Sequence, residues 1–289
     1  NIRQRQTNTL SSSTNTSGGL VVPGWYNLSN SNGPVNILTD YMSKRRLIGL
    51  YADLNLSYKN LFFLQATARN DWSSTLPKQN NSFFYPSVSG SFVFSELLKE
   101  SSISDVLTYG KIRSSWAMVG NDTDPYQLLT TFNKATVNGN FGSTVFPFGN
   151  VTALSAGSTI GNMDLKPEKT TSFEIGTELG FLQNRLSLDF SYYKNNSKNQ
   201  ILSIPIPNST GYGFSIINAG EVQNKGVELS LRGTPVKTDN FTWEVFGTYT
   251  KNDNKVVSLL PGVDQGSIGG FTGMSVVAAV GRPYGEFYA

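Results

Sequence analysis

An alternation of apolar and polar residues over 61–74 (LFFLQATARNDWSS) constrains this chain more than any other feature. The side chains of a β-strand point to opposite faces with period two, so the segment is predicted to be a strand with one apolar face. Such a strand suits a soluble sandwich with a wet outer face, and equally a membrane barrel whose wet face points inward. The alternate positions that share the apolar face, called here the apolar parity, are Phe62, Leu64, Ala66, Ala68 and Trp72.

The same alternation recurs along the chain and predicts about nine strands with no convincing helix. A charged fraction of 15% and an aromatic fraction of 12% agree with an all-β fold. No apolar run reaches the roughly 18 residues that a transmembrane helix needs. The further predicted strands are 46–58, 84–95, 107–119, 170–181, 185–193, 226–232, 241–249 and a fragment near 283–289.

The connections between these strands alternate in length. Tight turns at 58–61 and 182–185, a short link at 233–240 and an intermediate one at 96–106 separate the long segments. Outer-membrane barrels place short turns on the periplasmic side and long loops outside, whereas a Greek-key sandwich has no reason to sort its connections. The sequence therefore predicts an antiparallel transmembrane β-barrel segment. Its long connections are 74–83, 120–169, 199–224 and 252–282, all rich in Asn, Gly, Ser or Pro.

Aromatic residues on the apolar parity are spaced to match a bilayer. Phe62 and Trp72 are ten residues apart, as are Phe84 and Phe94. Ten residues rise about 33 Å, which a tilt of about 40° reduces to roughly 25 Å, the height of a lipid-facing band. These pairs predict two aromatic girdles, although aromatic residues are common in strands of every kind.

Two groups of residues are candidates for contact with a substrate or partner. Residues on the polar parity should line the lumen, either paired across strands, which we favour, or in contact with substrate. Aromatic residues of the long loops could stack on a sugar ring or a partner, although loop self-packing could explain most of them. The lumen candidates are Asp53, Asn55, Arg69, Asp71, Glu174, Glu178 and Glu228. The loop candidates are Trp25, Tyr26, Tyr126, Phe146, Phe148, Tyr212 and Phe214.

Composition argues against most enzyme classes. The chain has no cysteine and no histidine, which excludes disulfides, thiolate metal sites and histidine-based catalysis. Asp122 and Asp124 are too sparse for a calcium loop, and no pair of carboxylates is placed for glycoside hydrolysis. The net charge of +3 shows no basic cluster beyond 44–46, so no nucleic-acid site is expected. We therefore predict no catalytic residue, cofactor or metal.

Several longer motifs resemble one family. RNDWSS followed by FFYPSVSGSFVFSE, KIRSSWAMVGND, and the block 165–231 with LKPEKT and NKGVE are similar to SusC-like (RagA-type) TonB-dependent outer-membrane transporters. The resemblance covers most of 45–289, and residues 1–44 resemble a variable external loop. Trp116 stands where the family usually has Tyr, and Phe94 where Trp is frequent. Within NKGVE, Gly226 is expected to permit a bulge where a strand begins.

The resemblance implies a barrel of about 22 strands that surrounds a plug domain. It implies active import of oligosaccharides or peptides across the bacterial outer membrane, with a SusD-like lipoprotein outside and TonB acting on the plug. We expect residues 1–289 to be a piece of that barrel, without the plug or the terminal strands, because an open sheet in lipid leaves two edges unpaired. The alternatives are a passive porin-type or structural barrel, a soluble β-sandwich carbohydrate-binding module, and an adhesin.

Overall fold

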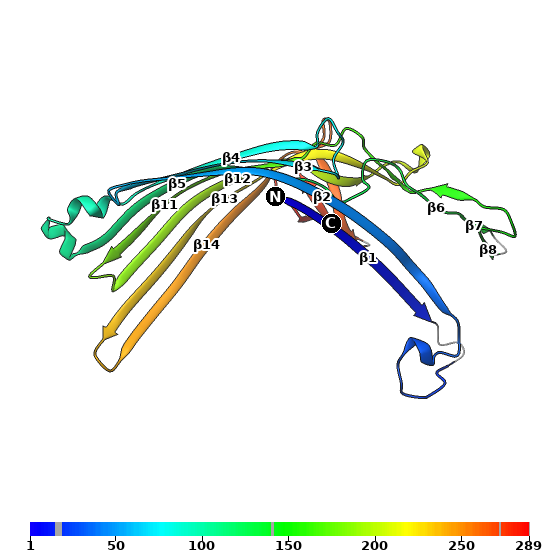
Figure 1. Cartoon of the computed structure of the whole chain (residues 1–289), viewed down its shortest axis with the longest axis horizontal. Helices are drawn as coiled ribbons and strands as arrows, with labels where there is room; N and C mark the ends of the chain where they lie inside the picture. Colours follow the sequence, from blue (N-terminus) through cyan, green and yellow to red (C-terminus); the bar gives the residue numbers. More distant parts are fainter. Residues whose placement is uncertain (15–18, 140–141, 272, 289) are drawn as a thin grey trace.

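The computed structural model describes residues 1–14, 19–139, 142–271 and 273–288. In that part of the chain, nine long strands form one antiparallel sheet in which each strand pairs with the next. The sheet arches without closing on itself (Figure 1). The all-β, antiparallel prediction is thus confirmed. The nine strands are β1 (Ile2–Thr14), β2 (Val35–Tyr58), β3 (Phe62–Ser73), β4 (Ser82–Phe92), β5 (Leu107–Asn121), β11 (Glu168–Phe181), β12 (Leu186–Pro205), β13 (Phe214–Lys237) and β14 (Thr242–Ser258).

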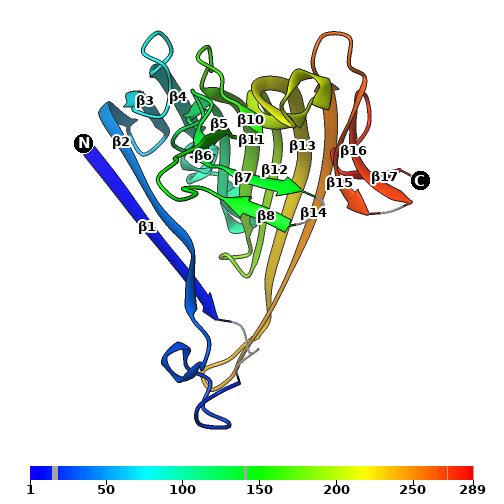
Figure 2. The same cartoon turned by 90° about the vertical axis from the view of Figure 1, so that its right-hand side faces the viewer.

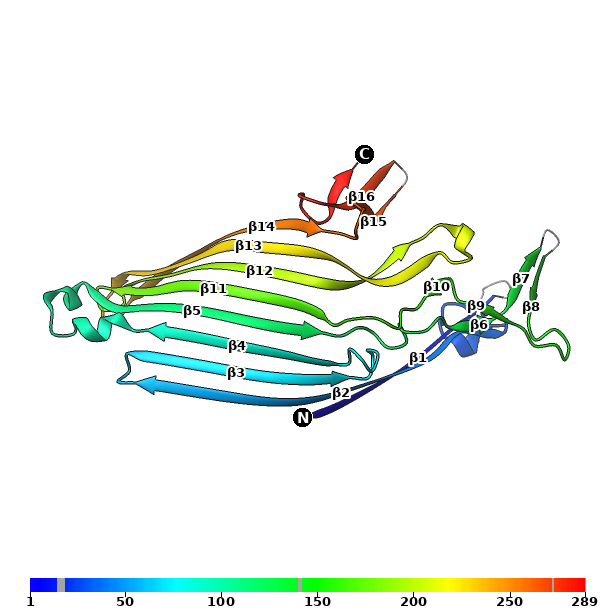
Figure 3. The ribbon, with the colours of Figure 1, turned by 90° about the horizontal axis from the view of Figure 1, so that it is seen from above.

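The connections lie at two ends of the arch, which Figure 3 shows at its left and right. The short-turn end carries 59–61, 182–185, 238–241 and a segment with two 3₁₀-helices, η2 (Phe94–Leu98) and η3 (Ser102–Asp105). The opposite end, called here the loop end, carries 15–34, 74–81, 122–167, 206–213 and the segment after β14. The difference in length is large for 15–34 and 122–167. It is absent for 206–213, because β12 and β13 extend into the predicted loop 199–224.

Residues 1–44 differ most from expectation. They do not form a loop throughout: Ile2–Thr14 is strand β1, which pairs with β2 from Ile2 opposite Ile48 to Thr14 opposite Val35. Ile48 in turn pairs with Trp72 near the end of β3, so β1 begins where the predicted membrane band ends. The segment is therefore a hairpin that extends the sheet at the loop end. The sequence hides it because both faces of β1 are polar.

The loop end contains smaller elements. Segment 122–167 folds into β6 (Phe132–Lys134) with β9 (Leu154–Ala156) and β7 (Thr136–Gly139) with β8 (Gly142–Val145). β10 (Thr159–Ile160) then joins the main sheet in parallel with β13. Figure 3 shows β6 to β8 beyond the loop end of the long strands, and Figure 2 shows a separate sheet near the C-terminus. The remaining elements are η1 (Leu28–Asn30), η4 (Asn208–Thr210), β15 (Gln265–Phe271), β16 (Met274–Ala279) and β17 (Glu286–Tyr288).

The buried apolar core of the described residues is small and lies at the loop end. Leu165, which is fully buried, packs with Leu76 and Ile216, and Phe83 and Leu128 cover the cluster. Residues from two connections and two strands therefore meet at one point. Among the described residues, no helix is long and apolar enough to span a membrane.

Candidate lumen wall and external loops

The strand register places side chains of like polarity on the same face of the sheet. Leu56, Leu64, Gly90 and Ser114 follow one another across β2 to β5, and the apolar parity continues on the remaining long strands. We call this the apolar face and the other side the polar face. In β5 the polar-face positions 111, 113 and 115 are partly buried, whereas 112, 114 and 116 are exposed. Side chains crowd together inside a curve, so the polar face is the concave one.

Aromatic side chains on the apolar face gather toward both ends of the strands. At the short-turn end the rings of Phe62 and Phe92 stack with centroids 4.8 Å apart. β4 ends at Phe92, so Phe94 is not in the predicted strand; its ring instead covers Gly110 of β5. Large apolar side chains exposed in such numbers mark a surface that another phase or protein covers. The short-turn set is Tyr58, Phe62, Phe92 and Trp243, and the loop-end set is Trp72, Phe84, Trp116, Phe173 and Tyr249.

Arg113 is the centre of an ion-pair network on the polar face. Its guanidinium nitrogens lie 2.8 Å from an oxygen of Asp189, 2.9 Å from Glu178 and 3.6 Å from Glu174. Lys111 adds a second contact to Glu178 at 3.0 Å. The network ties β5, β11 and β12 together. Glu174 and Glu178 were lumen candidates from the sequence. Lys111, Arg113 and Asp189 were not, although their places on the polar parity of 107–119 and 185–193 could have indicated them.

A second polar cluster lies on β3 and β4. Arg69 donates from Nε to Asp71 at 2.8 Å, and Tyr85 donates its hydroxyl proton to the same carboxylate. The Arg69 guanidinium also lies 5.9 Å from the centroid of the Tyr85 ring. Two of the lumen candidates are therefore paired with each other within β3, whereas the favoured alternative expected pairs across strands; here Tyr85 of β4 supplies the contact across strands.

A third cluster lies on β2. The side-chain amides of Asn55 and Gln65 both donate to the carboxylate of Asp53, the latter at 3.0 Å. Glu228 lies on the polar face of β13 and is exposed. It lines a groove of about 560 Å³ together with Glu174, Tyr193, Asn224 and Asn252. All seven lumen candidates thus share the polar face; whether they contact substrate stays a prediction.

Two glycines lie opposite large side chains of the polar face. Because they have no side chain of their own, the large side chains can extend over the neighbouring strand. Gly176 pairs with Arg113, and a Cβ there would lie 3.0 Å from the guanidinium carbon. Gly226 pairs with Tyr193, whose hydroxyl reaches Asn252 on the next strand at 3.0 Å. The register of β13 does not shift at Gly226, so the predicted bulge is wrong. This glycine instead leaves room for the tyrosine ring.

A buried carboxylate that the sequence analysis set aside organises the loop end. Asp122, which is 7% exposed, follows β5 directly and accepts from Arg45 Nε at 3.0 Å and from Thr75 Oγ1 at 3.0 Å. Arg45 Nη2 and Ser73 Oγ also contact it. We call Asp122, Arg45, Ser73 and Thr75 the Asp122 knot. It joins the start of loop 122–167 to β2 and β3, and only the three-dimensional arrangement shows it.

The other end of the same loop is held by amide side chains. Asn80 donates to the carbonyl of Leu165 at 3.0 Å, and Gln79 donates to that of Met163 at 2.8 Å. Asn218 of β13 accepts from the Lys166 N–H at 2.8 Å and donates to its carbonyl at 2.7 Å. Both ends of loop 122–167 are therefore fixed on the wall, while its middle part projects (Figure 3).

The seven aromatic loop candidates are spread over three connections. Tyr26 is 89% exposed near the tip of 15–34, and Trp25 beside it is also exposed. Tyr126 makes an edge-to-face contact with Tyr41 at 6.4 Å, the one ring contact found for the seven within the described residues. Phe148 is exposed, while Phe146 and Tyr212 are half-buried and Phe214 opens β13. The seven do not form one site, and their roles stay predictions.

An arched antiparallel sheet with an exposed, aromatic-banded face and a concave, ion-paired face defines the wall of a transmembrane β-barrel. The comparisons with known proteins agree. The chain matches the TonB dependent receptor-like β-barrel family over residues 2–274. TonB-dependent receptor P26 of Formosa agariphila is 34% identical over 250 residues, which are 83% of this chain and 23% of the relative.

Two further matches extend this result. TonB-dependent receptor SusC of Bacteroides thetaiotaomicron is 29% identical over 231 residues, or 78% of this chain and 22% of SusC. The solved RagAB peptide transporter superposes with a TM-score of 0.74 at 23% identity, covering 91% of this chain and 28% of that one. The chain belongs to the TonB-dependent receptor β-barrel family, and the resemblance seen in its motifs is confirmed. It spans less than a quarter of the length of the two receptors.

Proposed function

We propose that this chain is part of the wall and outer loops of a TonB-dependent outer-membrane transporter that imports oligosaccharides or peptides. The observation that supports this most is the division of one sheet into an exposed apolar face and a concave polar face. A wall of this kind separates hydrocarbon from water or from a plug. The remaining strands and the plug, through which TonB acts, would come from parts of the transporter outside residues 1–289.

The polar face suits a hydrogen-bonding substrate. Its groove beside Glu228 presents the amides of Asn195, Asn224 and Asn252 and the hydroxyl of Tyr193. Amide and hydroxyl groups both donate and accept hydrogen bonds, so they suit sugar hydroxyls and peptide groups alike. The proposal therefore keeps both substrate classes. The exposed rings of Trp25 and Tyr26 would stack on sugars that arrive from outside.

Loop 122–167 is proposed to contact a SusD-like lipoprotein that covers the loop end. It exposes Phe132, Val137, Phe148 and Leu154 to solvent, with Leu154 71% exposed. Apolar side chains gathered on an external loop mark a protein-binding surface. The names of two matches, SusC and the RagAB complex, agree with a partner of this kind.

Uptake by cells that carry or lack the complete gene tests the transport proposal. Deletion should abolish uptake of labelled oligosaccharides or of labelled peptides, and the same loss should follow when TonB is removed. Uptake that persists without TonB would favour the passive porin. A protein that stays soluble without detergent would favour the sandwich module.

A pull-down tests the partner. Shortening 135–160 in the complete transporter should reduce retention of the lipoprotein, because the exposed apolar side chains of this segment are removed. The heat-modifiable barrel should still assemble, since both ends of the loop keep their contacts with the wall. Unchanged retention would remove the role given to this loop.

A further inference from the structure

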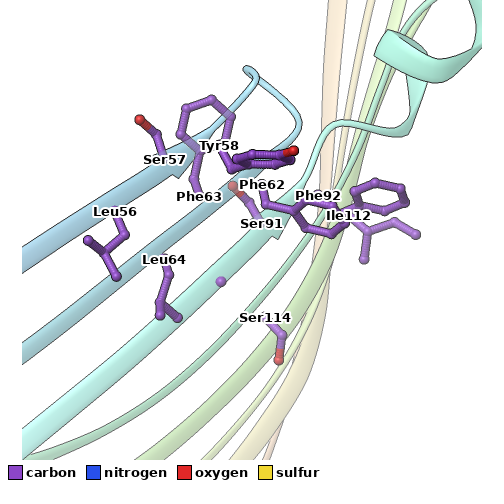
Figure 4. Close-up of a pocket in the computed structure, with 11 residues that line it drawn as sticks. Leu56, Ser57, Tyr58, Phe62, Phe63, Leu64, Ser91, Phe92, Ile112 and Ser114 are labelled. Atoms are coloured by element: carbon purple, nitrogen blue, oxygen red, sulfur yellow. The ribbon is translucent and has the colours of Figure 1, made fainter.

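A groove crosses the apolar face near the short-turn end of β2 to β5 (Figure 4). Its volume is about 440 Å³. Gly90 forms its floor: a Cβ built there would have its nearest neighbour, the carbonyl oxygen of Phe63, 3.9 Å away. The register partners of Gly90 are Leu64 and Ser114, so a missing side chain opens the space between them. The side chains around it are those of Leu56, Tyr58, Phe62, Leu64, Phe92 and Ile112.

Stacked rings form part of the wall of this groove, and a cation lies over Tyr58, one of its lining residues. Phe62 and Phe92 are stacked with an interplanar angle of 15°, and Phe92 contacts Phe94 at 6.4 Å. Lys59, in the turn just beyond β2, holds its ammonium 5.3 Å from the centroid of the Tyr58 ring. An apolar channel inside the aromatic band thus leads to a positive charge at headgroup depth.

We propose that this groove seats one acyl chain of a phospholipid from the periplasmic leaflet, with the phosphate held by Lys59. The assignment rests on the proposed function, which places the short turns on the periplasmic side. An acyl chain lying over Gly90 would contact the apolar side chains that line the groove, such as Leu64 and Phe92. Lysine at the end of the channel favours an anionic headgroup.

Native mass spectrometry of the complete protein in detergent, titrated with dioleoylphosphatidylglycerol, tests the groove. A Cβ at position 90 meets no atom closer than 3.9 Å, so Gly90→Leu should fill the groove and lower the population with one tightly bound lipid about fivefold. The matched control is Ala68→Leu, which adds similar bulk, one carbon less, to the apolar face outside the groove and should leave that population unchanged. Equal retention by Gly90→Leu and the wild type, or equal loss in both variants, would overturn the proposal.

The headgroup contact is tested with a second lipid. Lys59 has φ +50°, which asparagine tolerates, so Lys59→Asn removes the charge and keeps the turn. The wild type should prefer dioleoylphosphatidylglycerol to dioleoylglycerol, and Lys59→Asn should lose that preference; a preserved preference refutes the contact. Heat-modifiable migration of every variant is measured in parallel. A chain that never enters the outer membrane contradicts the proposed function, whereas normal insertion with unchanged lipid binding contradicts this inference alone.

Discussion

The same strands have different sequences inside and beyond the proposed membrane band. Between Phe62 and Trp72, β3 alternates apolar and polar residues, and its neighbours do the same. Toward the loop end, β12 and β13 carry Lys194, Asn196 and Gln223 on the parity that is apolar nearer the turns. β12 and β13 stay paired through all three of these residues, so only the surroundings of the side chains have changed. Alternation therefore reports which medium touches each face, and it does not report where a strand ends.

Arginine substitutions on the two faces of β3 give the strongest test of this difference. Ala66 lies midway between Phe62 and Trp72 on the apolar face, and Thr67 beside it lies on the polar face. Arginine on the lipid side at mid-depth costs about 2–4 kcal/mol, whereas lumen positions accept it. Ala66→Arg should thus yield far less assembled, heat-modifiable barrel than Thr67→Arg.

Asn196 provides the control for depth. It has the parity of Ala66 but lies in the part of β12 and β13 beyond the proposed membrane band, called here the extension. There its side-chain amide donates to Glu221 at 3.0 Å. Asn196→Arg should assemble like the wild type. If Ala66→Arg assembles as well as the other two variants, the apolar face does not meet hydrocarbon, and the contrast between band and extension fails.

The next largest effect is expected on resistance to urea, when one cation is removed from the membrane band and another from the extension. Arg113→Met leaves Glu178, Asp189 and Glu174 without their shared partner, at a cost of about 1–3 kcal/mol. Lys198→Met breaks a pair in the extension, where Lys198 is more than half exposed and lies 3.3 Å from Glu221. Exposed pairs contribute about 0–1 kcal/mol, so this control should change little. The measurement is the urea concentration at which the barrel loses heat-modifiable migration; equal shifts would contradict a special role for the Arg113 network.

The strand centres and the two faces follow from the sequence, because alternation depends only on neighbours along the chain. β1 does not, since both of its faces are polar. The outer parts of β12 and β13 do not either, since adjacent apolar residues such as Ile216 and Ile217 break the alternation there. The partners of each polar residue also require the register. Tyr193 shows why: its place over Gly226 depends on how β12 pairs with β13, and no local pattern contains that information.

The loop end shows the same limit more strongly. In the Asp122 knot, Asp122 contacts residues that are 47 to 77 positions away in the sequence. Sequence reasoning tested Asp122 as a calcium ligand only, and it could not place Arg45 beside it. Likewise, the parity of the lumen candidates gave their face, whereas Arg113, which organises two of them, became visible only through the contacts between β5, β11 and β12.

The smallest effect expected here is local, and it tests whether the Asp122 knot holds loop 122–167 or the wall. Asp122→Asn keeps the shape of the side chain but removes the charge that Arg45 Nε and Thr75 Oγ1 contact. A hydrogen bond to a charged group is worth about 1.5 kcal/mol, which corresponds to roughly tenfold easier local opening. Hydrogen exchange should therefore accelerate about tenfold in 122–131, while β3 and β12 exchange as in the wild type. Asp124→Asn is the matched control, because Asp124 is exposed two residues further along and should leave exchange unchanged. Faster exchange throughout β3 would mean that the knot stabilises the wall itself, and the two regions would then be one cooperative unit.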